Sequence, residues 1–405
     1  MRLIHTADWH LGQFFYTKSR APEHEAFLAW LVAQVEQQQI DAVIVAGDVF
    51  DTGSPPSYAR ELYNRFIVQL HQTGCQLIIL AGNHDSVAML NESRELLACL
   101  NTRVIAAASE DPADQVLLLN RRDGQPGAVL CAIPFLRPRD ITLSKAGQSG
   151  REKQQTLLEA ITHHYQRSYT AAEKMRDELG QPLPIIATGH LTTMGVTKSD
   201  AVRDIYIGTL DAFPAQAFPP ADYIALGHIH RAQRIADTDY IRYSGSPIPL
   251  SFDELGREKS VFRVDFADGK LSAVTPLTVP LFQPMRMIKG SLEEIETALN
   301  AIEPPEAGQK VWLDIEIVTQ TWLNDLQRRI QEITENLPVE VVLLRRSREQ
   351  RENIINRQNN ETLSELSVEE VFQRRLAGEE EEPERLARAT LLFKQTLAEI
   401  NEEPS

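Results

Sequence analysis

The apolar positions at the start of the chain form short, mostly unbroken runs separated by helix-spaced runs. Arg2–Ala7, Asp41–Ala46 and Leu77–Ala81 have the apolar character of strands buried on both faces. Pro22–Gln38 has the spacing of an amphipathic helix, and a second helix is expected to begin near Pro55. Strand, helix, strand, helix in this order predicts an α/β fold with a largely parallel sheet covered by helices.

The middle of the chain continues this pattern, with further strands and one long helix. The strands are predicted at Ala128–Ile133, Ile185–Thr188, Tyr223–Leu226, Tyr240–Tyr243 and Val261–Phe266, and the helix at Arg151–Leu179.

After Pro280 the pattern restarts on a smaller scale and predicts a compact second α/β unit. It consists of strand Met285–Lys289, helix Ser291–Ile302, strand Val311–Val318, helix Thr321–Asn336 and strand Val339–Leu344. The expected domains are therefore residues 1–280, a small capping domain at 281–344 and a helical tail at 345–405.

The tail has few apolar residues, which lie on one side of two helix-like stretches separated by Glu379–Glu382. These residues are Leu363, Leu366, Val371 and Phe372, followed by Leu386, Leu391, Leu392, Phe393 and Leu397. A narrow apolar face on a polar helix fits docking onto another chain. Packing on its own domain explains the same pattern equally well.

Composition narrows the class of protein. The 405 residues carry 41 basic and 57 acidic side chains, a net charge of −16, which argues against tight unaided binding to DNA. Cys75, Cys99 and Cys131 form no C-x-x-C pair, so neither a disulfide framework nor a cysteine zinc site is expected. No apolar run is long enough to span a bilayer and no signal peptide is recognised, so the expected compartment is the cytoplasm, without membrane attachment.

Polar side chains follow the ends of the predicted strands in five short motifs. The motifs are Asp8-Trp9-His10, Gly47-Asp48-Val49-Phe50-Asp51, Gly82-Asn83-His84-Asp85, Gly189-His190 and Gly227-His228-Ile229-His230. The carboxyl ends of strands are where ligands bind in open α/β sheets, so we expect these residues to meet at one edge.

The residue types at these positions fit a pair of divalent metal ions. Carboxylates, imidazoles and an amide oxygen suit ions such as manganese, iron or zinc. Asp-x-His and His-x-His place alternate side chains on the same side of an extended segment. Asp48 is the candidate to bridge two ions that clamp a phosphate and activate a water. A single such motif is weak, because a lone His is more often a core or surface residue, but five in this order are not expected by chance.

These motifs resemble the signature of the calcineurin-like metallophosphoesterases. The stretches His5–Gly12, Ala46–Pro55, Gly189–Thr193, Ala225–His230 and Tyr243–Glu254 are similar to one branch of that family. This branch contains the nuclease subunits of the bacterial SbcCD complexes, counterparts of the archaeal and eukaryotic double-strand-break nucleases. The resemblance covers essentially the whole chain and implies a mixed-sheet sandwich covered by helices.

The resemblance also implies the two sets of metal ligands. One ion would be held by Asp8, His10, Asp48 and His230, and the other by Asp48, Asn83, His190 and His228. His84 would act on the scissile phosphate, and Asp85 would orient His84. The archaeal and eukaryotic relatives carry a second catalytic His where this chain has Asp51, so no role is transferred to Asp51.

Two other functions compete with the nuclease. Protein Ser/Thr phosphatases share the metal signature but typically read G-D-x-V-D-R-G, and Thr52 here cannot grip a phosphomonoester as that Arg would. A metal-binding scaffold without turnover could lose a ligand, yet none is missing. The expected reaction is metal-dependent hydrolysis of DNA phosphodiesters, with two Mn²⁺ ions as the expected cofactors.

The resemblance finally implies partners. Subunits of this type work with a coiled-coil ATPase, SbcC, in a complex containing two nuclease subunits. The nuclease subunit by itself is expected to cleave single strands. The full complex is expected to act as an ATP-dependent double-strand exonuclease and to open hairpins. The chain has no phosphate-binding G-x-x-x-x-G-K-[ST] motif, so ATP dependence must come from the partner. Two groups of arginines could contact DNA or remain solvated: Arg121, Arg122, Arg137 and Arg139, and Arg345, Arg346, Arg348 and Arg351.

Overall fold

The computed structural model of the chain describes residues 1–142, 148–199, 202, 212–305, 308–318, 326–347 and 392–393. The chain divides into two compact units, Met1–Arg345 and Arg346–Ser405. The two helices predicted in the tail lie outside the described residues, apart from Leu392 and Phe393, which are helical.

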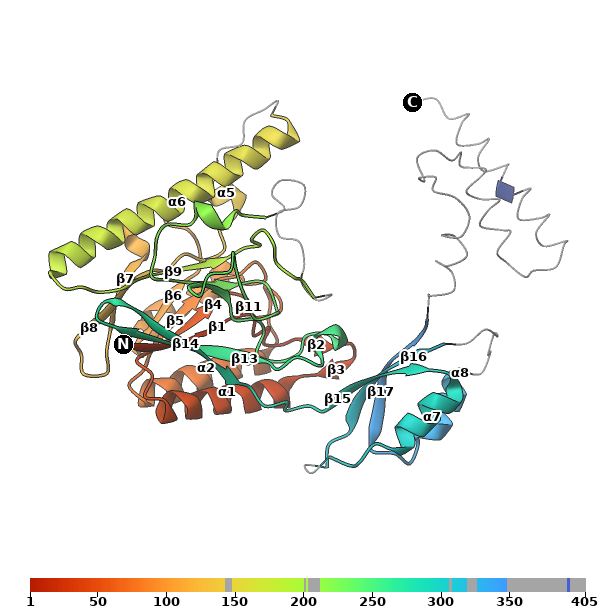
Figure 1. The fold of residues 1–405 in the computed structure, drawn as a ribbon. Coiled ribbons are helices and arrows are strands. Elements are labelled where there is room, and N and C mark those ends of the chain that lie inside the picture. The colour runs from red at the N-terminus through yellow and green to blue at the C-terminus, as the bar shows by residue number, and fades with distance from the viewer. Residues whose placement is uncertain are drawn as a thin grey trace. The chain divides into compact units, whose positions relative to one another are not determined.

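Two six-stranded sheets form the main body of the first unit (Figure 1). The first sheet has the order β14-β13-β1-β4-β5-β6, with bounds Lys270–Thr278, Ser260–Ala267, Arg2–Thr6, Ala42–Ala46, Gln76–Leu80 and Thr102–Ile105. The second has the order β11-β12-β10-β9-β8-β7, with bounds Gln233–Arg234, Ile241–Tyr243, Tyr223–Gly227, Ile185–His190, Pro126–Cys131 and Val116–Asn120. Strands β1, β4, β5 and β6 are parallel, whereas β13 and β14 pair antiparallel, so the mixed-sheet sandwich is confirmed.

Helices cover the outer faces of both sheets, as Figure 1 shows for α1 and α2 on one side and α6 on the other. Helix α1 spans Ala21–Gln37, α2 spans Ser57–Gln72 and α6 spans Gly150–Leu179. Helix α6 begins with a capping box between Ser149 and Glu152, which satisfies two amides of the first turn. Short helices occupy the loops: α3 at Val87–Asn91, α4 at Arg94–Ala98, α5 at Pro138–Ile141, and 3₁₀ turns η1 at Pro112–Gln115, η2 at Ala215–Ala217 and η3 at Phe252–Glu254.

The alternation of side chains along each strand explains the layers. In β4, Val43 and Val45 pack toward α1 and α2, whereas Ala42 and Ile44 belong to the core between the two sheets. Both faces of this strand are therefore buried, which is why its sequence is apolar throughout. A third apolar cluster joins the second sheet to α6 through residues such as Ile161 and Tyr165.

A three-stranded sheet, β15-β16-β17, forms the small C-terminal part of the first unit. Its elements are β15 (Met285–Gly290), α7 (Leu292–Asn300), β16 (Val311–Ile317), α8 (Leu326–Thr334) and β17 (Val339–Arg346). It has its own apolar cluster, and it contacts the hairpin of β2 (Phe14–Phe15) and β3 (Lys18–Ser19). There Phe15 stacks on Trp312, with ring centroids 5.7 Å apart.

Several elements were not predicted from the sequence: the short helices α3, α4 and α5, and strands that lie at the edges of sheets. The short strands β2, β3, β6, β7 and β11 and the edge strand β14 were not predicted. Strand β14 consists of exposed and half-buried residues, and its sequence lacks a clear apolar alternation. Arg345 belongs to β17 and not to the tail that was predicted at 345–405. Its Nε donates to Asp314 Oδ1 across the small sheet at 3.1 Å. Among the described residues, no helix is both long and apolar enough to cross a membrane.

Candidate metal centre

The motif-bearing loops from both sheets meet at one end of the sandwich. Asp8, Asp48 and Asn83 follow β1, β4 and β5, which are parallel neighbours in the first sheet. His190 ends β9, and His228 follows β10, its parallel neighbour in the second sheet. Strand β4 contacts both β9 and β10, so the carboxyl ends of the two sheets lie next to each other.

The Asp8-Trp9-His10 loop is fixed by burial of its middle residue. The Trp9 ring is fully buried, packs edge-on against Phe27 and Phe66, and donates its indole N–H to Thr6 Oγ1 at 2.9 Å. The flanking Asp8 and His10 are buried as well, but their left-handed φ angles mean that they do not alternate along an extended segment as predicted.

Four of the predicted ligands have a left-handed backbone. The φ angles are 54° at Asp8, 46° at His10, 50° at Asp48 and 94° at His228. Such angles cost about 1–3 kcal/mol each in non-glycine residues and are concentrated at functional sites. Backbone bonds from Asp8 N to Gly47 O and from His10 N to Asp48 O, at 3.0 and 3.1 Å, hold two of the loops together.

The structure brings the predicted ligands together as two buried clusters. Asp8, His10 and His230 form one, and Asp48, His190 and His228 form the other, with the ligand atoms within each lying no more than 4.8 Å apart. Asp48 Oδ2 lies 3.2 Å from His190 Nε2 and 3.7 Å from His10 Nε2, so this carboxylate stands between the clusters.

The polar atoms of the second cluster fit a cation. His190 Nδ1 donates its proton to the carbonyl of Ala46 at 2.9 Å, which leaves the lone pair of a neutral ring on Nε2. This nitrogen lies 3.0 Å from Asn83 Oδ1 and 3.2 Å from Asp48 Oδ2, so three acceptors converge. A metal ion between them would relieve that repulsion.

The electrostatics of the cluster agree with this picture. Burial lowers the pKa of His190, but the adjacent Asp48 carboxylate outweighs burial and raises it to about 9. Burial raises the pKa of Asp48, yet His190 and His10 hold it well below its usual value. Asp48 is therefore ionised at neutral pH, as a bridging ligand must be.

Several predicted ligands have buried polar atoms without a hydrogen-bond partner. Within the described part of the chain, Asp8 Oδ2, His10 Nε2 and His228 Nε2 are buried and have no hydrogen-bond partner. Buried polar atoms are normally satisfied, so their grouping among the predicted ligands fits metal coordination. The donor set, made of imidazole nitrogens and carboxylate and amide oxygens, suits a borderline-hard divalent ion.

Asp51, to which no role was assigned from the sequence, contacts His10, a predicted metal ligand, and His84, the predicted catalytic residue. Its Oδ1 lies 3.2 Å from His10 Nδ1, and its backbone carbonyl accepts the Nδ1 proton of His84 at 2.7 Å. His84 and His10 pack edge to face, with ring centroids 4.8 Å apart. Its position three residues after Asp48 was the only hint in the sequence that Asp51 lies near the site. The spacing could not predict how the His10 and His84 rings are oriented toward it.

The Asp85 carboxylate accepts hydrogen bonds from backbone amides, whereas a contact with the His84 ring was predicted. Its Oδ1 accepts the amide of Phe50 at 3.0 Å, and its Oδ2 accepts those of Gly82 and Val49 at 2.8 and 3.2 Å. These bonds tie the loop after β5 to the loop that carries Asp48. We therefore revise the role of Asp85 from orienting the His84 ring to fixing these two loops.

The arginines that could contact DNA have different surroundings in the structure. Arg122 bonds the carbonyls of Ile40 and Thr73 at 2.8 Å each, so it serves the fold. Arg137 donates to the carbonyl of Asp85 at 3.2 Å and so lies beside the centre, and Arg139 is exposed.

The chain matches two family descriptions. Residues 1–232 match the calcineurin-like phosphoesterases, and residues 281–380 match a domain described as the type 5 capsule protein repressor C-terminal domain.

Curated relatives extend the similarity to the whole chain. A protein of Escherichia coli K12, named as the SbcD subunit of the nuclease SbcCD, is 63% identical over 98% of this chain and 98% of its own length. Proteins of the same name from Rhodobacter capsulatus and Bacillus subtilis are 35% and 30% identical, over 76% and 78% of this chain and 77% and 79% of their own lengths.

Proposed function

The chain belongs to the calcineurin-like phosphoesterases and, within them, to the SbcD family of SbcCD nuclease subunits, and on this premise we propose how its residues hydrolyse DNA. It is a metal-dependent DNA nuclease, a hydrolase of phosphodiester bonds. The observation that carries the residue assignment is the convergence of two buried ligand clusters on Asp48.

In this proposal, Asp8, His10, Asp48 and His230 hold one divalent ion, and Asp48, Asn83, His190 and His228 hold the other. Bound metal ions supply the charge that clamps the scissile phosphate and lowers the pKa of the attacking water. The His84 ring, fixed through Nδ1 by the Asp51 carbonyl, presents Nε2 to the phosphate. When protonated, it can give that proton to the leaving oxygen.

The loop after β4 favours a diester over a monoester. Thr52 stands where a phosphatase of the same superfamily would carry an arginine, and a hydroxyl cannot neutralise the additional charge of a monoester. A DNA phosphodiester carries one charge fewer and does not require that group.

The proposal includes Mn²⁺ as the metal, which is one of the divalent ions, with iron and zinc, that imidazole, carboxylate and amide ligands suit. It includes assembly into an SbcCD complex, which the relatives' name states. We further propose, from the resemblance alone, that the partner is the coiled-coil ATPase SbcC and that two nuclease subunits form a heterotetramer with it. This partner would supply the ATP-dependent steps, duplex exonuclease and hairpin opening. The net charge of −16 supports a requirement for basic surface from another subunit. The proposed compartment is the cytoplasm, where the DNA substrate is.

The test is cleavage of single-stranded DNA with Mn²⁺, with and without chelator, by the wild type and by Asp48→Asn. We expect cleavage by the wild type only, and hydrolysis of an aryl phosphodiester in preference to the monoester. Asp123→Asn, in the exposed turn between β7 and β8, is the matched control and should cleave as the wild type does. Preference for the monoester, or full cleavage by Asp48→Asn, would refute the proposal.

A further inference from the structure

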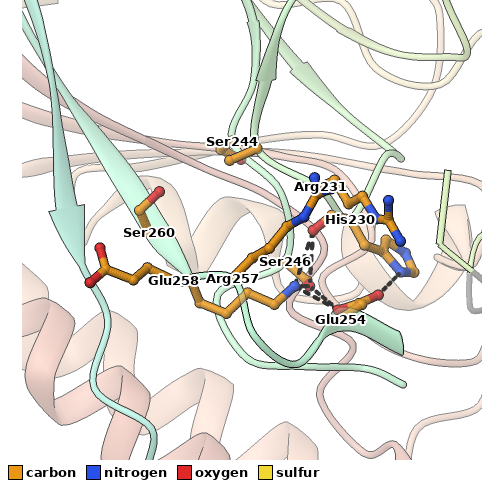
Figure 2. Close-up of a pocket in the computed structure, with 10 residues that line it drawn as sticks. His230, Arg231, Ser244, Ser246, Glu254, Arg257, Glu258 and Ser260 are labelled. Carbon is orange, nitrogen blue, oxygen red and sulfur yellow. Dashed lines mark hydrogen bonds and ion pairs between the residues drawn. The ribbon is translucent and has the colours of Figure 1, made fainter. Parts of the chain in front are cut away.

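Behind the predicted metal ligand His230 lies a buried polar network that the proposed mechanism does not use. Figure 2 shows it beside a small cavity, with Glu254, Ser246 and the His230 ring connected by dashed contacts. Glu254 comes from η3 and Lys259 from the residue just before β13, so the network joins two segments of the chain to the loop after β10.

Glu254 is almost fully buried, and both of its oxygens are engaged. Oε2 accepts from Lys259 Nζ at 2.6 Å, from the amide of Leu250 at 2.9 Å and from Ser246 Oγ at 3.2 Å. Oε1 accepts from Ser199 Oγ at 2.7 Å and faces His230 Nδ1 at 3.3 Å. This last contact is close but lacks good hydrogen-bond geometry, so Nδ1 has no regular acceptor among the described residues.

Lys259 holds the backbone of the same residue. Its Nζ donates to the carbonyl of His230 at 3.1 Å and to Ser246 Oγ at 2.7 Å, in addition to Glu254. The ammonium therefore uses its three donors, and it neutralises the buried carboxylate. His230 is thus approached at its ring by Glu254 and at its carbonyl by Lys259.

A buried ion pair such as Glu254 and Lys259 is not expected to add much to the stability of the fold. Taking two charges out of water costs about as much as their attraction returns, and apolar replacements are often neutral or stabilising. The pair also lies against a ring that packs edge to face with the predicted ligand His10, with ring centroids 5.2 Å apart. A carboxylate behind a metal-binding imidazole is the arrangement that fixes its tautomer and orientation.

We propose that Glu254 is a positioning residue for the metal centre, which holds His230 through Nδ1, while Lys259 neutralises Glu254 and holds the His230 carbonyl. The inference rests on the proposed two-metal function. A carboxylate accepts only a proton, so the contact selects the Nδ1–H tautomer and leaves the lone pair on Nε2 for the metal. A bound metal would draw charge from the ring and make the Nδ1 proton a stronger donor to the Glu254 carboxylate.

The test is a Mn²⁺ titration of the full chain followed by electron paramagnetic resonance of the free ion. In Glu254→Gln we expect one of the two ions to bind about 10–100-fold more weakly and the other to bind as in the wild type. Cleavage of single-stranded DNA should fall at limiting Mn²⁺ and return at saturating Mn²⁺. Glu258→Gln, an exposed neighbour lining the same cavity, is the control and should bind both ions normally.

A second variant guards against a misfolded single mutant, because Glu254→Gln leaves the Lys259 ammonium buried and unpaired. Glu254→Gln combined with Lys259→Met removes both charges, and we expect the same selective loss with an unchanged circular dichroism spectrum of the metal-free protein. Tight binding of both ions, equal weakening of both, or unfolding of the metal-free double variant would overturn the inference. A wild type that binds fewer than two ions would instead refute the proposed function.

Discussion

Asp51 and Asp48 lie three residues apart in one loop and have different relations to the centre. Asp48 stands between the two ligand clusters, whereas the Asp51 carboxylate faces the far nitrogen of His10, at 3.2 Å. A carboxylate in that position orients the ring and increases its basicity as a ligand. We therefore propose that Asp51 supports His10, at the position where the resemblance places a catalytic histidine in the archaeal and eukaryotic relatives.

We predict that Asp51→Asn weakens Mn²⁺ binding about 10-fold or more, because the negative charge that increases the basicity of His10 is lost. The protein should stay folded, because the amide oxygen of the new side chain can still contact His10. Isothermal titration with Mn²⁺ measures this, with Asp123→Asn as the control. Unchanged affinity for both ions would show that Asp51 does not support His10.

His84 should behave differently, because it is assigned to the phosphate and not to a metal. His84→Ala is expected to keep both ions and to lower turnover by about 10²–10⁴-fold, the loss typical of a general acid–base group. Elemental analysis beside single-turnover kinetics separates the two effects. Loss of metal in proportion to activity would mean that His84 is a ligand.

At this scale the sequence predicted which residues meet but not how their rings are held. The seven predicted ligands could be named from sequence because each lies at or after a strand end in a recognisable motif. The contacts of Asp51, Asp85 and Glu254 depend on ring and loop orientation across the fold, and Glu254 lies 24 positions beyond His230. Spacing carries no information on such contacts.

At the scale of elements, close approach of the strand ends explains the glycines beside the ligands. A Cβ on Gly227 would overlap the carbonyl of Ala46, and one on Gly82 would overlap Asp48. The ends of β4, β5 and β10 can approach each other only because these positions lack side chains.

We predict that Gly227→Ala destabilises the protein by about 1–3 kcal/mol, the usual cost of overpacking, and displaces the loop carrying His228 and His230. Thermal unfolding of the metal-free protein and Mn²⁺ content measure the two effects. Gly150→Ala is the control, because nothing lies within 4 Å of its added Cβ. Wild-type stability and metal content in Gly227→Ala would contradict the close approach.

The central strands were predictable from sequence and the edge strands were not, for one physical reason. Strands such as β4 and β5 are covered on both faces, so burial itself requires their apolar runs. Edge strands such as β14 face solvent, so pairing rather than burial fixes their register, and their sequences carry little pattern.

At the scale of the whole molecule, the segment after β17 is predicted to be a docking element. Its apolar residues are few and one-sided, and isolated helices of that length are marginal in water. Arg345 bonds Asp314 within the small sheet, so a truncation must leave β17 complete.

Truncation after Ser347 should therefore keep Mn²⁺-dependent cleavage of single strands while removing binding to the ATPase subunit and ATP-dependent processing of duplex ends. A pull-down and both cleavage assays on one preparation measure this. Insolubility or loss of all cleavage would place the tail in the catalytic core. Full binding of the partner would move the interface elsewhere, to the small domain first.

The proposed mechanism depends above all on two metal ions that share Asp48, and anomalous X-ray diffraction from crystals soaked in Mn²⁺ would locate such ions without reference to activity. We expect two anomalous peaks, one among Asp8, His10 and His230 and one among Asn83, His190 and His228, each with an oxygen of Asp48 in its coordination shell. A single fully occupied peak in an active enzyme, or two peaks of which only one contacts Asp48, would contradict the shared ligand.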